Sequence, residues 1–331
     1  MKYSGNPVLT PTSGAWDNDY VSTPRVLLTA SLYRMWYDGG SGGVAAIGYA
    51  NSTDGFTWTK YSNPVLSPGG PGAWDSGRVA LGSVIWNGTD FLMWYAGSNT
   101  TVSGGAVGLA TSTDGISWMK YSGNPVLVRT VSSPDQSYMA SPYVIKLTTE
   151  YWMWYTGRNT TYPDPNPVAR ILAATSYDGI TWTKAPSPEI VPSSNSTIWD
   201  SGSVYSASVI FSGTNFGLWY TGTNQSYLSP QIGFASSSSG ENWTQSTMNP
   251  ILSAGTPGSW DSAGVEQPCV IVGGQGFMLY YDGFSPNAGE RIGLAIGPQG
   301  FVVPEFSAPT VNLLIIAAIS TTYFAKLKRK R

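Results

Sequence analysis

One repeat unit of the chain reads Asn63-Pro64-Val65-Leu66, then Trp74-Asp75, Met93-Trp94-Tyr95, Val107-Gly108-Leu109-Ala110, Asp114-Gly115 and Trp118. Its opening motif recurs at Asn6-Pro7-Val8-Leu9, Asn124-Pro125-Val126-Leu127, Asn249-Pro250-Ile251-Leu252 and, in degenerate form, Ser187-Pro188-Glu189-Ile190. The starts of the five copies lie 57, 61, 63 and 62 residues apart. Internal similarity at a fixed period is the sequence signature of a repeat architecture.

Within each copy, the apolar runs predict four short antiparallel strands. The first begins four residues after the Trp-Asp aspartate, the second carries Met-Trp-Tyr, and the third carries Gly-Leu-Ala. A tight Asp-Gly hairpin turn then leads to a fourth strand at Trp118 or its counterpart. Four-stranded units repeated radially form a β-propeller, so we expect an all-β, five-bladed fold. A stacked solenoid is the alternative, although solenoid repeats are shorter.

The repeat also predicts how the ring closes. We expect a propeller over residues 1–302, with blades at about 10–62, 63–123, 124–186, 187–248 and 249–302. The last copy lacks the Asp-Gly-x-x-Trp-x-Lys-Tyr stretch, whereas the chain begins with Lys2-Tyr3, which matches Lys60-Tyr61. Residues 1–9 should therefore complete the fifth blade. We also expect the natural chain to begin upstream of Met1, with the missing stretch and a signal peptide.

Composition narrows the chemistry that this chain can support. Its 331 residues include no His and one cysteine, Cys269. The lack of His excludes Ser-His-Asp catalysis and His-ligated metals, and a single cysteine excludes a disulfide framework. Five of the 17 basic residues lie in the last six positions, which leaves 12 basic against 19 acidic residues elsewhere. An acidic body argues against a nucleic-acid partner.

Residues 303–331 differ from the repeats. Val303-Pro304-Glu305-Phe306 precedes a mostly apolar stretch, Val311–Ala325, and a basic tail. The stretch is short for a membrane span, but a following basic cluster is typical of a cytoplasmic flank. We therefore expect a C-terminal transmembrane helix that anchors an extracellular propeller at the cell surface, with a buried C-terminal helix as the alternative. Seven Asn-x-Ser/Thr sequons would permit glycosylation.

The repeated motifs resemble those of the five-bladed propeller glycosidase superfamily, which includes glycoside hydrolase families 32, 43 and 130. The resemblance covers residues 1–302 and rests on Asn-Pro-Val-Leu, Trp-Asp, Met-Trp-Tyr-x-Gly and Gly-Leu-Ala-x-Ser-x-Asp-Gly-x-x-Trp. It implies cleavage of glycosidic bonds by carboxylates at the mouth of the central channel. The C-terminal segment resembles an archaeal Pro-Glu-Phe sorting signal, where a sortase-like enzyme cuts the chain and transfers it to a lipid.

The family 43 pattern implies three catalytic carboxylates. Asp17 or Asp19 fits the base or nucleophile, Asp75 fits the residue that tunes the pair, and blade three offers Asp135 where the family has a glutamate. Asp19 departs from the repeat, whereas five other aspartates recur at one spacing. These entry aspartates are Asp17, Asp75, Asp135, Asp200 and Asp261. Their structural alternative is strong, because an aspartate present in every blade usually caps a turn.

Glu266 also departs from the repeat, in the first strand of the last copy. Its counterparts are Ser22, Ala80, Ala140 and Tyr205. First strands line the channel of a propeller, so a carboxylate there should be partly desolvated and have a raised pKa. A protonated carboxyl group suits a general acid. The alternative is a channel residue held by water or by an arginine.

Several polar residues near the ends of the strands are candidates for sugar binding. They are Arg25, Asp38, Arg78, Arg158, Tyr205, Gln267 and Asp282. Sugars hydrogen-bond to carboxylates and amides and stack on aromatic rings, so carbohydrate is the expected partner. We expect a glycoside hydrolase or phosphorylase, or alternatively a non-catalytic surface propeller that binds carbohydrate or protein. No cofactor is predicted, and the carboxylates would allow calcium without specifying a ligand loop.

Overall fold

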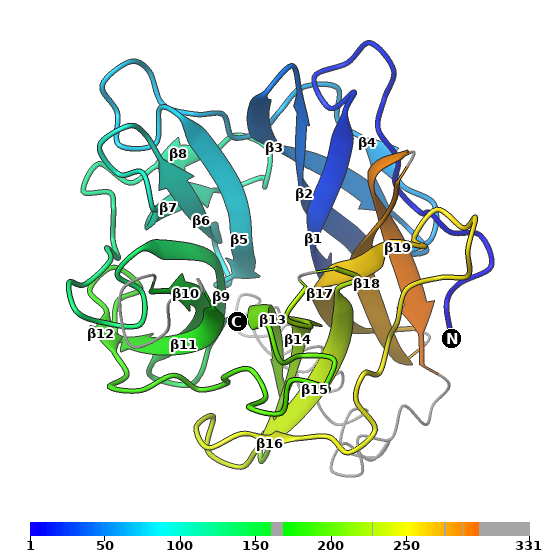
Figure 1. Cartoon of the computed structure of the whole chain (residues 1–331). Helices are drawn as coiled ribbons and strands as arrows, with labels where there is room; N and C mark the ends of the chain where they lie inside the picture. The colour runs from blue at the N-terminus through cyan, green and yellow to red at the C-terminus, as the bar shows by residue number, and fades with distance from the viewer. Residues whose placement is uncertain (160–167, 227, 275, 287, 298–331) are drawn as a thin grey trace, which may run out of the picture.

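The computed structural model describes residues 1–159, 168–226, 228–274, 276–286 and 288–297. Five antiparallel sheets surround a central axis, and the chain passes through them in order around the ring (Figure 1). Four sheets have four strands in chain order, and the fifth has three. The prediction of an all-β, five-bladed propeller with antiparallel blades is confirmed.

The strand bounds repeat from blade to blade. The innermost strands are β1 (Tyr20–Thr29), β5 (Arg78–Trp86), β9 (Tyr138–Lys146), β13 (Ser203–Phe211) and β17 (Gly264–Gly273). The second strands are β2 (Leu32–Ser41), β6 (Phe91–Ser98), β10 (Tyr151–Arg158), β14 (Phe216–Thr223) and β18 (Gly276–Ser285). The third strands are β3 (Val44–Ser52), β7 (Ala106–Ser112), β11 (Ala169–Ser176), β15 (Gln231–Ser237) and β19 (Ala288–Ile296). The outermost strands are β4 (Thr59–Lys60), β8 (Met119–Lys120), β12 (Thr183–Lys184) and β16 (Thr244–Gln245).

The Met-Trp-Tyr motif fills the space between neighbouring blades. Trp36 of β2 is fully buried against Val79 and Phe91 of blade two, and its Nε1 donates to the carbonyl of Gly115 at 2.8 Å. Gly115 has a φ of +80°, and a Cβ there would lie 2.9 Å from the Trp36 ring, so the Asp-Gly turn requires glycine. Truncating a buried tryptophan typically costs about 3–5 kcal/mol, so these contacts hold adjacent blades together.

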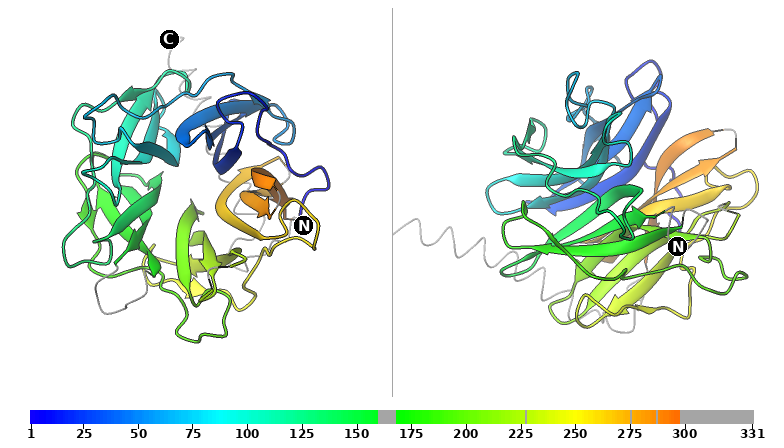
Figure 2. Two further views of the ribbon diagram at one scale, coloured as in Figure 1. Left: turned by 45° about the horizontal axis from the view of Figure 1, so that its top comes forward. Right: turned by 60° about the vertical axis from the view of Figure 1, so that its left-hand side comes forward.

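The N-terminal segment occupies the outer edge of blade five. The Tyr3 N–H donates to the Leu294 carbonyl of β19 at 2.9 Å, and the Val8 N–H donates to the Ile292 carbonyl at 2.8 Å. Lys2 forms an ion pair with Asp261 at 2.6 Å. The first residues of the chain therefore lie beside its last described strand, as Figure 2 shows from a second direction.

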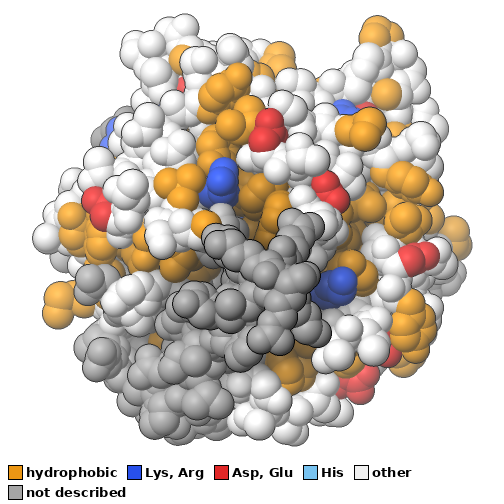
Figure 3. Space-filling view, turned by 180° about the vertical axis from the view of Figure 1, so that it is seen from behind, with side chains coloured by type: hydrophobic (Ala, Val, Ile, Leu, Met, Phe, Trp, Pro, Cys, Tyr) orange, Lys and Arg blue, Asp and Glu red, His pale blue; other side chains and the backbone are white. Residues whose placement is uncertain are grey.

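The expected sorting motif, transmembrane helix and basic tail at 303–331 lie outside the described residues. The part of the chain that the structure describes contains no helix with the length and apolarity that a membrane crossing needs. On the face turned away in Figure 1, the described charged side chains are few and scattered (Figure 3). They form no continuous basic surface in that view.

Candidate functional site

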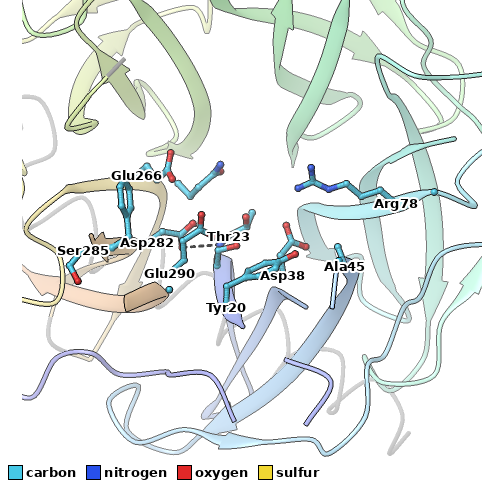
Figure 4. A pocket seen from close by; sticks show the side chains of 15 residues that line it. Tyr20, Thr23, Asp38, Ala45, Arg78, Glu266, Asp282, Ser285 and Glu290 are labelled. Carbon is cyan, nitrogen blue, oxygen red and sulfur yellow. Dashed lines mark hydrogen bonds between the residues drawn. The ribbon is translucent and has the colours of Figure 1, made fainter. Parts of the chain in front are cut away.

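A cavity of about 670 Å³ opens near the central axis among blades one, two and five. We call it the carboxylate cavity. Its ionisable lining residues are Tyr20, Asp38, Arg78, Glu266, Asp282 and Glu290. Figure 4 shows Arg78 extending into the opening from blade two, with the acidic side chains reaching it from blades one and five. The structure thus gathers four carboxyl groups and one guanidinium in a single space.

Irregularities in the innermost strands lie at the wall of this cavity. The pairing of β1 with β2 shifts between Ser22 and Arg25, and the pairing of β17 with β18 shifts between Glu266 and Cys269. Inside these bulges, Thr23 and Gln267 have positive φ values of 52° and 54°. Strained backbone of this kind tends to cluster at functional sites. Here it places two adjacent residues from each strand in the cavity lining.

Each bulge turns a backbone N–H towards the preceding blade, where a second-strand side chain accepts it. Asp282 accepts from the Thr23 N–H at 2.8 Å, and Asp38 accepts from the Leu81 N–H at 2.7 Å. Thr156 and Thr221 accept in the same way, at 3.0 Å, from the N–H groups of Ser206 and Gln267. The fifth equivalent position holds Ala96. We call these five second-strand positions the acceptor ring: Asp38, Ala96, Thr156, Thr221 and Asp282.

The acceptor ring shows that the hydrogen bonds made by Asp38 and Asp282 do not require a carboxyl group. A threonine hydroxyl satisfies the same N–H in blades three and four. Asp38 and Asp282 are 5% and 1% exposed, and burying a carboxylate costs several kcal/mol unless it is well compensated. Their charge is therefore better explained by the cavity than by the strand geometry.

Burial makes Asp38 an unusually weak acid. It raises the pKa of Asp38 to about 6, although the Leu81 N–H and the positive charge of Arg78 both lower that pKa. Asp38 is then ionised in most molecules near neutral pH and can accept a proton when the pH is only slightly lower. This protonation behaviour suits a base.

Burial raises the pKa of Glu266 further, to about 7, against the lowering effect of the Tyr205 hydroxyl. That hydroxyl donates to Glu266 Oε2 at 2.7 Å. Burial, together with the negative charges of Glu290 and Glu266, raises the pKa of Asp282 well above its ordinary value. One cavity therefore holds a carboxyl group with a pKa of about 7 and another with a pKa of about 6, and acid–base catalysis uses carboxyl groups whose pKa values differ in this way.

Arg25, expected to bind substrate, does not line the cavity. It is 2% exposed, and its guanidinium donates to the Pro24 carbonyl at 2.8 Å, the Pro268 carbonyl at 3.3 Å and the Gly82 carbonyl. The guanidinium also lies 5.6 Å from the centre of the Tyr143 ring. Arg25 thus connects the innermost strands of blades one, two and five, and it supports the site indirectly.

The entry aspartates lie outside the cavity, inside their own blades. Asp17 accepts from the Tyr37 hydroxyl at 3.2 Å and pairs with Lys60 at 2.6 Å. Asp75 and Asp135 have the same kinds of partner, which are Tyr95 with Lys120 and Tyr155 with Lys184. The three expected catalytic aspartates therefore hold the first turn of a blade against its second and outermost strands.

Two further candidates are also outside the lining of the carboxylate cavity. Asp19 lies in an exposed turn, where it accepts from the Asn18 amide at 2.9 Å and the Gly42 N–H at 2.8 Å. Arg158 packs over Tyr138, with 4.8 Å from its guanidinium to the ring centre. By contrast, the structure brings Glu266, Gln267, Asp38, Asp282 and Arg78 together, with Tyr205 directly beside Glu266.

Sequence reasoning missed Glu290 and Tyr20 in the lining. When the third strands are aligned by their pairing with the second strands, the position of Glu290 in β19 is occupied in the other blades by Ala45, Gly105, Ala169 and Pro230. It therefore breaks the repeat as clearly as Glu266 does, and a comparison of third strands would have found it. Tyr20 has no such signal, since β9 begins with a tyrosine in the same register.

A metal site is not evident in the described part of the chain. Among those residues, no group of three or more acidic, cysteine or histidine side chains is placed to hold a metal ion.

Several of the known proteins that this chain resembles act on carbohydrates. No protein-family model matches the chain. An uncharacterized protein of Mycobacterium tuberculosis, found in strains CDC 1551 and H37Rv, is 26% identical over 293 residues, which cover 85% of this chain and 93% of that protein. A β-1,2-mannobiose phosphorylase of Thermoanaerobacter sp. strain X514 is 31% identical over 118 residues, or 31% of this chain and 37% of the enzyme.

Solved structures show the same architecture over nearly the whole described chain. A thermostable family 43 glycoside hydrolase superposes with a TM-score of 0.70 and 17% identity, covering 87% of this chain and 92% of that enzyme. A structure from the family 130 mannoside phosphorylases and hydrolases that target β-1,2 mannosidic linkages gives a TM-score of 0.68 and 16% identity, covering 89% and 93%. At such identities the likeness establishes the fold. The chain thus has the five-bladed propeller fold that these glycoside-processing enzymes share.

Proposed function

We propose that this protein is a glycoside hydrolase whose reaction takes place in the carboxylate cavity. The observation that carries the proposal is the pairing of Glu266, with a pKa of about 7, and Asp38, with a pKa of about 6, in one cavity. The apolar stretch 311–325 and the basic tail behind it support placing the propeller at the cell surface, anchored by its C-terminal segment, as part of the same proposal.

In the proposed mechanism, Glu266 donates its proton to the glycosidic oxygen as the bond from the anomeric carbon to that oxygen breaks. Asp38 accepts a proton from the water that attacks the anomeric carbon. The products are two free sugars, and one proton then returns to Glu266 from solvent as Asp38 releases one. Asp282, which accepts from the Thr23 N–H, positions β1, and the negative charge of Glu290 helps to keep Glu266 protonated.

The charge of the cavity favours water over phosphate as the attacking group. Among its described lining residues, Arg78 is the one cation, and it faces four carboxyl groups. A phosphate dianion would need several donors and cations, whereas here it would meet like charge. Phosphorolysis, the activity named for the Thermoanaerobacter relative, is therefore the second candidate.

The test is release of reducing sugar from a panel of disaccharides that begins with β-1,2-mannobiose, with and without inorganic phosphate. Glu266→Gln should lower kcat at least about 100-fold, because it removes the proton donor and keeps the size of the side chain. Glu241→Gln, at an exposed turn of blade four, is the matched control and should retain full activity.

Three other outcomes would change the proposal. Release that depends on phosphate would make the protein a phosphorylase. Equal activity of the two Gln variants would remove Glu266 from the mechanism. Binding of sugars without any release by the folded wild type would favour the non-catalytic alternative.

A further inference from the structure

A second cavity adjoins the carboxylate cavity, between blades two and three. Its volume is about 180 Å³. Thr23, Asp38, Arg78 and Gln267 line both cavities, so the two spaces meet at these residues. We call the smaller space the side cavity.

The side cavity exists because small residues replace larger ones at the junction of these blades. Ala96 occupies the acceptor-ring position that holds threonine or aspartate in the other four blades. Gly104 and Gly105 follow it in the lining, and a Cβ on either would lie within 2.4 Å of a backbone oxygen of blade three. The glycines bring the loop before β7 close to β9, while Ala96 leaves the space between them open.

Ala96 supplies no side-chain oxygen at its place in the acceptor ring. Ser141 of β9 has a φ of 49°, and Ser206 of β13, its counterpart, has a φ of 53°. The Ser206 N–H donates to Thr156 at 3.0 Å, whereas Ala96 at the equivalent place offers the Ser141 N–H no such acceptor. A hydroxyl oxygen supplied by a ligand could take the position of the absent threonine oxygen.

The remaining lining is uncharged and combines small apolar residues with hydroxyl groups. Ser98, Ser103 and the Tyr138 ring contribute to it, and Arg158 packs on that ring at 4.8 Å. Away from the junction with Asp38 and Arg78, the described lining holds no ionisable side chain other than the Tyr138 phenol. Hydroxyls, a backbone N–H that has no acceptor at Ala96 and an aromatic ring suit the hydroxyls and C–H face of a neutral sugar.

We propose that the side cavity is the binding subsite for a second, uncharged sugar unit of the substrate. This proposal rests on the proposed function, because it takes the carboxylate cavity as the place of the sugar whose bond is broken. The glycosidic bond would then cross the junction beside Asp38 and Arg78. The substrate class is accordingly a disaccharide or longer glycan with a neutral sugar at this position.

The test fills the side cavity with threonine, the residue that blades three and four have at this position. Ala96→Thr supplies the acceptor for the Ser141 N–H and occupies the space. For disaccharides, kcat/KM should fall at least 10-fold, mainly through KM. Hydrolysis of the corresponding glycosyl fluorides should change less than twofold, because fluoride leaves the second position vacant.

Two more variants separate binding from folding. Thr156→Ala makes the reverse exchange in blade three, outside both cavities, and should leave the disaccharide KM unchanged. Tyr138→Ala keeps Ala96 but removes the ring and should reproduce the loss on disaccharides only. If Ala96→Thr or Tyr138→Ala reduces activity on fluorides and disaccharides equally, or on neither, the subsite assignment is overturned.

Calorimetric titration with unlabelled disaccharides keeps this result separate from the proposed function. If the wild type cleaves nothing but binds disaccharides, and Ala96→Thr binds them at least 10-fold more weakly, hydrolysis fails and the subsite stands. If both proteins bind equally, or neither binds, the subsite is overturned.

Discussion

Asp200 is an entry aspartate without a lysine partner. Gln245 donates to it at 3.3 Å, where the other four blades place a lysine. Burial raises the pKa of Asp200, whereas Lys184 lowers that of Asp135. The pKa of Asp200 is therefore higher in the folded protein than the unfolded value of 3.8. As the pH rises from the unfolded to the folded pKa of this group, the folded state loses stability.

Gln245→Lys should reverse this effect. The added cation lowers the folded pKa of Asp200, so the ionised form stabilises the blade above about pH 4. We expect a gain of about 1 kcal/mol and about 2 °C in Tm at pH 7, with no gain at pH 3. Lys120→Gln, the opposite change in blade two, should lose a similar amount. Thermal unfolding at both pH values tests this prediction. An equal gain in Tm at pH 3 would contradict an ionic cause.

Arg78 should control the acidic limb of the pH–rate profile. Its positive charge lowers the pKa of Asp38, which must be ionised, but it is not among the groups that shift the pKa of Glu266, which must be protonated. Activity should therefore be greatest between about pH 6 and 7. In Arg78→Gln the acidic limb should move up by about half a unit while the alkaline limb stays.

The limbs of kcat/KM against pH test this expectation, with Arg34→Gln as the control because Arg34 packs on Phe91 away from the cavity. A shift of the alkaline limb, or of neither limb, would mean that Asp38 is not the base.

The sequence could not show which of the buried aspartates belong to the site. The entry aspartates and Asp38 are all buried aspartates, and only their partners separate a blade contact from a cavity wall.

At the scale of the element, the repeat was sufficient to predict the strands but not their bulges. The strand positions followed from Met-Trp-Tyr, Gly-Leu-Ala and the Asp-Gly turns, because buried aromatic and β-branched residues recur at fixed places. The bulges in β1, β9 and β13 have positive φ values at Thr23, Ser141 and Ser206. Because none of these residues is glycine, the sequence does not indicate this conformation. In β1 and β13, hydrogen bonds to the neighbouring blade stabilise that backbone, so the cause there lies in a contact between elements and not in the local sequence.

The same limit explains which site residues the sequence revealed. Glu266 was found because it breaks the pattern of the first strands, and Asp38 and Asp282 because they end second strands on the side where loops cluster. Their function as acceptors for N–H groups of the next blade became visible only in the assembled ring. The side cavity was not predictable for the same reason, since an alanine at position 96 is unremarkable until its counterparts are aligned in space.

At the scale of the whole molecule, the carboxylate cavity lies where the ring closes. Glu266, Asp282 and Glu290 come from the last blade, and Asp38 comes from the first. The bond from the Thr23 N–H to Asp282 crosses this junction directly. Residues 1–9 secure it from outside, with Leu9 only 4% exposed and Lys2 paired with Asp261. The geometry of the site therefore depends on a segment that contributes no residue to its lining.

Removal of residues 1–9 should consequently impair both stability and activity. The lost strand pairing, the exposed core around Leu9 and the broken Lys2–Asp261 pair should together lower Tm by about 10 °C. A synthetic peptide of residues 1–9, added in excess, should restore part of the Tm and of the activity, because it binds the folded ring and not the unfolded chain. Lys60→Met breaks the equivalent ion pair in blade one, whose outer strand stays covalently attached. It should lower Tm by only a few degrees and should not respond to the peptide. If the shortened chain kept its Tm but lost activity, the segment would act on the site alone, and ring closure would not be what holds blades one and five together.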